Sequence, residues 1–155
     1  MPDTTRVWIY QCDRNFTEDE AEHLTALCRA FAEKWTAHNV KLRSAAGVFY
    51  RRFICLFADE SAAGASGCSI DTSVRFIREQ EQRLNVSMTN RMLMAYAEGD
   101  TVETAHLNDL PEKLKSGVIR PDTPVFDNLI ATLGDMKAKW PAPFSETWFT
   151  KFSGE

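Results

Sequence analysis

The residues best suited to binding or reaction lie together between positions 58 and 73. The stretch has few large side chains and many hydroxyl groups. It contains one thiol, Cys68, and two glycines, Gly64 and Gly67. Glycine tolerates positive φ and lets a ligand approach the backbone closely. Residues 52–58 are nearly all apolar, as in a buried strand, and helical spacing of apolar residues follows the stretch. We therefore expect a strand-to-helix loop with binding or reactive groups.

The helix after this loop is expected at residues 69–84, with Ser69 as its N-cap and Asp71 in its first turn. The free N–H groups of a helix start can bind an anion, and the same partial positive charge favours a thiolate over a thiol. A plain connection with ordinary capping is the alternative. We predict small-molecule or anion binding at the loop Gly64–Ser73, with the ligand-binding residues Gly67, Cys68, Ser69, Asp71 and Thr72.

The elements that must position this loop follow the order strand, helix, strand, strand, helix, strand. Strands are expected at residues 6–11, 42–50, 52–58 and 91–97, and helices at 17–37 and 69–84. A capping box, Thr17 with Glu20, marks the start of the first helix. This is the βαββαβ order of a ferredoxin-like split βαβ sheet in the α+β class. An added edge strand at 101–107 and C-terminal helices complete the predicted fold.

The predicted order brings a second candidate group to the loop. The turn at residues 36–39 and the loop at 59–69 lie at the same end of such a sheet, so His38 could approach Cys68. A thiol, an imidazole base and an orienting carboxylate form a workable nucleophile arrangement. The alternative function is therefore a thiol enzyme with Cys68 as nucleophile and His38 as base. Without that approach, His38 simply interacts with the C-terminal dipole of its helix.

Composition limits the classes of protein. The chain has 155 residues, 44% of them hydrophobic and 26% charged, which fits one globular domain over residues 1–155. The net charge of −4 without a basic block argues against nucleic-acid binding. No segment reaches the roughly 20 apolar residues of a membrane span. The first ten residues lack a signal-peptide pattern, and none of the four cysteines forms a C-x-x-C pair, so we expect a cytoplasmic protein with free thiols. The histidines lack ligand spacing, and we predict no metal and no cofactor.

Residues 140–155 form an aromatic tail that contains Trp140, Phe144, Trp148, Phe149 and Phe152. So many aromatic residues are rarely left in solvent, so the tail is expected to pack on the core or on a partner. This gives a third hypothesis, a homo-oligomeric interaction protein that uses the tail and the edge strand.

Four segments carry a family resemblance: residues 6–11 with Asp13 and Arg14, 35–38, 65–77 and 123–129. Together they resemble a small bacterial family of uncharacterised proteins sometimes labelled "ABC transporter ATPase", and the resemblance spans about residues 5–130. It implies no activity and no site residues, because the family has none established. The label disagrees with the residues, since the chain has no G-x-x-x-x-G-K-[ST] motif and so lacks the lysine that reaches the phosphates.

Overall fold

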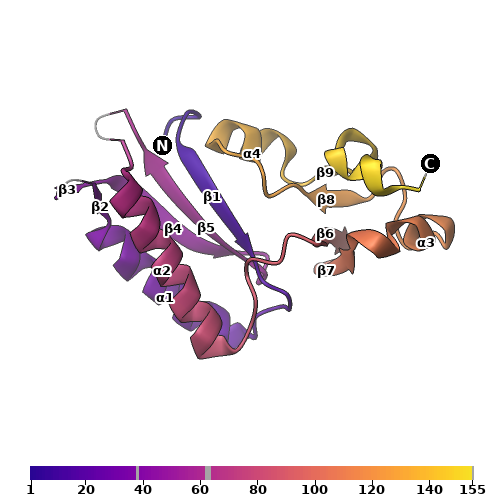
Figure 1. The fold of residues 1–155 in the computed structure, drawn as a ribbon, viewed down its shortest axis with the longest axis horizontal. Coiled ribbons are helices and arrows are strands. Elements are labelled where there is room, and N and C mark those ends of the chain that lie inside the picture. Colours follow the sequence, from indigo (N-terminus) through magenta and orange to yellow (C-terminus); the bar gives the residue numbers. More distant parts are fainter. Residues whose placement is uncertain (38, 62–63, 155) are drawn as a thin grey trace.

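The structure, a computed structural model, describes residues 1–37, 39–61 and 64–154. The first half of the chain forms a three-stranded antiparallel sheet of order β1-β5-β4, and two long helices cover one of its faces (Figure 1). Its elements are β1 Arg6–Gln11, α1 Glu18–Lys34, β4 Arg43–Phe49, β5 Phe53–Asp59 and α2 Gly67–Leu84. A short pair, β2 Thr36–Ala37 and β3 Val40–Lys41, lies between α1 and β4.

Local sequence signals explain where these elements begin and turn. The expected capping box is present at the start of α1, where Thr17 and Glu20 exchange hydrogen bonds. The β4–β5 hairpin turns at Tyr50 and Arg51, both with positive φ, as a type I′ turn requires. The helix ends at Lys34 rather than at residue 37, because Trp35 is extended and begins the passage into β2.

The second half of the chain forms a separate four-stranded sheet of order β7-β6-β8-β9. Its strands are β6 Leu93–Glu98, β7 Thr101–His106, β8 Pro124–Phe126 and β9 Ala142–Pro143, and its helices are α3 Leu110–Lys115 and α4 Leu133–Lys139. Short 3₁₀ helices lie at 107–109, 144–146 and 148–152. The predicted α+β class is therefore confirmed. No helix in the described ranges is both long enough and apolar enough to cross a bilayer.

The fourth strand of the expected ferredoxin-like sheet does not join the first sheet. That strand, β6, pairs with β7 on one side and with β8 on the other, so both of its edges are occupied. The first sheet therefore keeps three strands, and β1 stays at its edge. Within the described residues, the outer edge of β1 forms only one isolated β-bridge, between Arg6 and Thr132.

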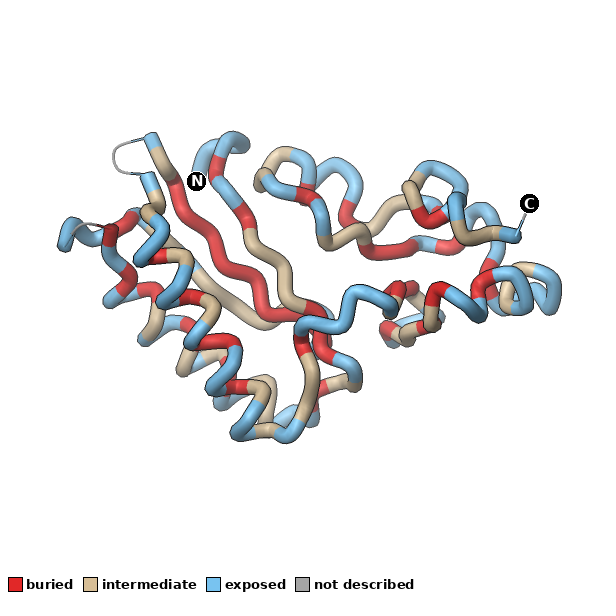
Figure 2. Tube along the Cα trace, in the orientation of Figure 1, coloured by how far each residue is buried: buried red, intermediate tan, exposed pale blue. Residues whose placement is uncertain are grey.

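Both faces of β5 are buried along its whole length (Figure 2). Ile54, Leu56 and Ala58 pack in the cluster under α1 and α2. Phe53, Cys55 and Phe57 pack in a second cluster with residues of the second sheet and α4. A third cluster, on the other side of the second sheet, includes Phe144 and Phe149 of the aromatic tail.

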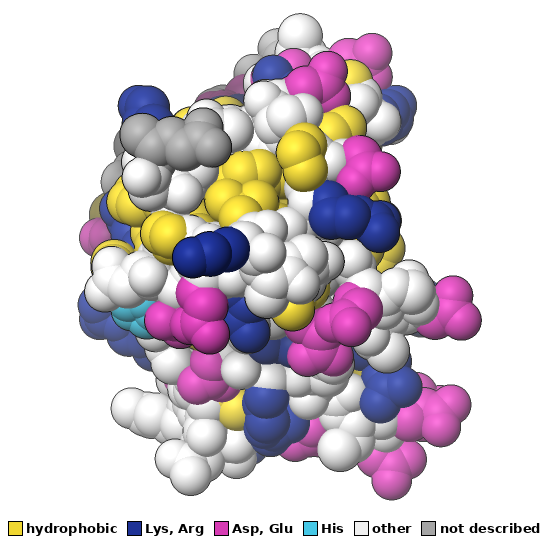
Figure 3. All heavy atoms as spheres, turned by 90° about the vertical axis from the view of Figure 1, so that its right-hand side faces the viewer, with side chains coloured by type: hydrophobic (Ala, Val, Ile, Leu, Met, Phe, Trp, Pro, Cys, Tyr) yellow, Lys and Arg dark blue, Asp and Glu magenta, His cyan; other side chains and the backbone are white. Residues whose placement is uncertain are grey.

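On the face of the molecule seen in Figure 3, apolar side chains gather between charged side chains of both signs.

The two halves are joined by a buried arginine. Arg52 is 4% exposed, and its guanidinium donates hydrogen bonds to the Cys12 carbonyl, to Asn15 Oδ1, to the Val102 carbonyl and to Thr104 Oγ1. Burial is the main cause that lowers the pKa of Arg52. Since two of its acceptors belong to β7, Arg52 fixes the hairpin of the first sheet against the second sheet.

Replacing Arg52 with Ala should lower the free energy of unfolding by about 3 kcal/mol, because several buried acceptors lose a charged donor. Urea denaturation followed by circular dichroism measures this change. Arg78→Ala is the matched control, since Arg78 is exposed on α2 and should change stability by less than about 0.5 kcal/mol. Equal stability of the two variants would contradict the joining role of Arg52.

Candidate functional site

The start of α2 differs from the prediction in its N-cap. The helix begins at Gly67 and Ser66 is its cap, not Ser69. Ser66 Oγ accepts the Ser69 N–H at 3.1 Å, and Ser69 Oγ accepts the Ser66 N–H at 2.6 Å. Ser69 is 1% exposed. The Ser69 amide and hydroxyl, both expected to face a ligand, therefore pair with the protein's own atoms.

Two acidic side chains hold the loop before α2 through hydrogen bonds and ion pairs. The Glu60 carboxylate accepts the Ala65 N–H at 3.0 Å and pairs with Arg6 at 3.3 Å. Asp59 accepts the Ser61 N–H and pairs with Arg43 at 3.1 Å, and the hydrogen bonds from Ser61 are the main cause that lowers its pKa. The two carboxylates therefore occupy the amides of Ser61 and Ala65, and each carboxylate is itself paired with an arginine.

The remaining predicted site residues that the structure describes lie on the surface at the start of α2. Gly67 and Cys68 are exposed in the first turn of α2. Asp71 and Thr72 are exposed just after that turn, so Asp71 does not lie in the first turn as predicted, and Thr72 Oγ1 donates to the Cys68 carbonyl. His38 lies outside the described residues, so its approach to Cys68 stays a prediction. Within the described ranges, no group of three or more His, Cys, Asp or Glu side chains could hold a metal ion.

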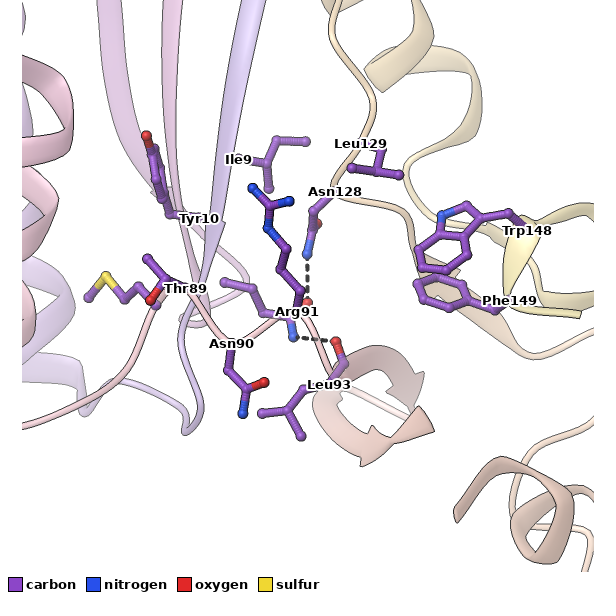
Figure 4. Close-up of a pocket in the computed structure, with 12 residues that line it drawn as sticks. Ile9, Tyr10, Thr89, Asn90, Arg91, Leu93, Asn128, Leu129, Trp148 and Phe149 are labelled. Carbon is purple, nitrogen blue, oxygen red and sulfur yellow. Dashed lines mark hydrogen bonds between the residues drawn. The ribbon is translucent and has the colours of Figure 1, made fainter. Parts of the chain in front are cut away.

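A cleft of about 340 Å³ lies instead beside β1, where the two halves of the chain meet (Figure 4). Four separate segments build it. The lining residues are Ile9, Tyr10 and Gln11 of β1; Met88, Thr89, Asn90, Arg91 and Leu93 before and within β6; Asn128 and Leu129 after β8; and Trp148 and Phe149 of the tail.

The walls of the cleft are held by a chain of hydrogen bonds. Gln11 donates to the Leu93 carbonyl at 3.2 Å and accepts from Asn128 at 2.7 Å. Asn128 in turn accepts from the indole N–H of Trp140. On the far wall Trp148 stacks on Phe149 at 4.3 Å between ring centroids, and its indole N–H donates to Asp127. These contacts fix the wall positions before any ligand arrives.

One positive charge enters this cleft. The Arg91 side chain extends from the segment before β6 toward Ile9, with its guanidinium between Ile9 and Asn128 in the view of Figure 4. Arg91 is exposed, and it forms no ion pair with any described residue. None of the lining residues is acidic. Tyr10 points to the other side of β1, and burial raises its pKa.

Sequence reasoning missed this cleft because its residues have no shared motif. They come from positions 9–11, 88–93, 128–129 and 148–149, which only the docking of the two halves brings together. The sequence did contain a signal for the second layer that forms one side of the cleft. The face of β5 opposite the helices is also apolar, with Phe53, Cys55 and Phe57, which indicates that a second layer covers it.

Comparisons of this chain with protein-family models, with curated proteins and with solved structures found no match. The resemblance to the family labelled "ABC transporter ATPase" therefore stays a prediction.

The structure predicts that Cys68 alone reacts quickly with a thiol reagent in the native protein. Cys12, Cys28 and Cys55 are buried, and burial raises the pKa of each, that of Cys28 to about 12. Titration with Ellman's reagent should give one fast thiol per chain, and Cys68→Ser should give none. A fast reaction that persists in Cys68→Ser would show that a buried thiol is accessible.

Proposed function

We propose that this protein binds a small molecule that carries an anionic group and an apolar group, in the cleft between β1 and the second half of the chain. The observation that carries the proposal is Arg91. Its guanidinium enters a cleft without acidic lining residues and has no ion-pair partner among the described residues. A guanidinium binds carboxylate or phosphate groups through paired hydrogen bonds.

The walls of the cleft support the apolar part of this ligand. Leu129 is 70% exposed, although its neighbours Ile9, Trp148 and Phe149 form an apolar surface beside it. A ligand that covers Leu129 would remove this apolar area from water. The volume of about 340 Å³ lies at the lower end of the range for small-molecule sites, which favours a compact ligand.

This proposal keeps small-molecule binding as the function but moves it away from the start of α2. There the Ser66–Ser69 capping box occupies the amides of Ser66 and Ser69, and the Glu60 carboxylate occupies the amide of Ala65. The oligomeric alternative loses part of its support as well, because Trp140, Phe144 and Phe149 are buried within the chain. The buried free thiols agree with our proposed cytoplasmic location, since a reducing compartment keeps them unpaired.

Isothermal titration with indole-3-acetate tests this function, with tryptophol as its uncharged analogue. We expect the acid to bind and the alcohol to bind about tenfold more weakly, because only the acid pairs with Arg91. Arg91→Gln should remove the difference between the two compounds, whereas Arg78→Gln, on the exposed face of α2, should preserve it. If the acid does not bind, or binds equally well to Arg91→Gln, the proposed site is wrong.

A further inference from the structure

The backbone of β1 has an unpaired outer edge inside the cleft. In an antiparallel pair of strands, every second residue directs its N–H and C=O groups to the neighbouring strand. The residues between them direct these groups to the opposite side. Cys12 donates its N–H to the Arg52 carbonyl across the hairpin, and Val7 donates its N–H to the Ala131 carbonyl on the opposite side. Ile9 has the same parity as Val7, so its N–H and C=O point away from β5. Within the described residues, neither group has a hydrogen-bond partner.

The cleft straddles this edge and does not lie on one face of the sheet. Successive residues of a strand point to opposite faces. Tyr10 packs with the cluster under the helices and Ile9 with the cluster of the second sheet, yet both line the cleft. A ligand in the cleft therefore meets the backbone of β1 between its two faces.

The edge is open over only a short length. At its start the bridge from Arg6 to Thr132 covers β1, and at its end the Gln11 side chain is tied to Asn128. A strand rises about 3.3 Å per residue, so the open part fits two or three residues of an added strand. A longer strand would run into the chain at Thr132, which favours the end of a chain over a passing segment.

We propose that the ligand is the C-terminal end of an extended peptide, which adds as a short strand beside Ile9 and places its free carboxylate on Arg91. This inference rests on the proposed function of the cleft and names its ligand class. The peptide backbone satisfies the outward N–H and C=O of Ile9, as in other cases of strand addition. The Arg91 charge selects a carboxylate end over an ammonium end. An apolar side chain of the peptide packs against Leu129 and Trp148.

Three matched peptides test this inference on the full chain by isothermal titration. They are N-acetyl-Ala-Ala-Phe with a free carboxylate, the same peptide as a C-terminal amide, and the free acid with N-methylated backbone amides. We expect the free acid to bind. Each of the other two peptides loses one set of contacts, so its affinity should be lower by about tenfold or more. In Arg91→Gln the acid and the amide should bind equally, whereas Arg78→Gln should behave as the unmodified protein.

The outcomes separate this inference from the function on which it rests. Equal binding of the N-methylated peptide refutes strand addition, and equal binding of the amide to the unmodified protein refutes carboxylate recognition by Arg91. If indole-3-acetate binds through Arg91 but no peptide binds, peptide recognition is wrong and the proposed function stands. If neither binds, both are wrong. If Arg91→Gln only promotes self-association, Arg91 protects an exposed edge and binds no ligand.

Discussion

The burial of both faces of β5 is the constraint on which the rest of this structure depends. Its side chains alternate between two apolar clusters, so the first sheet needs a covering layer on each side. The helices α1 and α2 supply one layer, and the second sheet with α4 supplies the other. Because the second half covers a face of the first sheet, it does not extend the sheet at β1. The open edge of β1 and the cleft beside it follow from this arrangement of the second half against the first sheet.

Polar contacts then fix the angle at which the two halves meet. Arg52 ties the β4–β5 hairpin to β7, and Gln11 ties β1 to Leu93 and Asn128. Apolar burial is non-directional, whereas a hydrogen bond weakens when its donor and acceptor shift out of line. The cleft therefore has a defined shape, with Arg91 near Ile9 and the Trp148–Phe149 pair on the opposite wall.

The sequence predicted local elements better than it predicted their assembly. The Thr17–Glu20 capping box, the hairpin near Tyr50 and the apolar strand β5 were all recognisable, since each depends on neighbouring residues. The N-cap of α2 was misplaced by three residues because Ser66 and Ser69 are both good caps, and only their reciprocal hydrogen bonds decide between them. The placement of β6 was wrong because pairing with β7 and β8 competes with pairing at β1, and residue types alone do not rank the two. The cleft, assembled from four distant segments, could not be predicted without that docking.

Amide hydrogen exchange of the unliganded protein, followed by NMR, tests the open edge of β1 most directly. Trp8 and Tyr10 donate within the ladder to β5, whereas the Ile9 N–H points into the cleft. The amide of Ile9 should therefore exchange at nearly the rate of an unprotected amide, while those of Trp8 and Tyr10 exchange slowly. If Ile9 were as strongly protected as Tyr10, another segment would cover this edge, and both the cleft and its proposed ligand would be wrong.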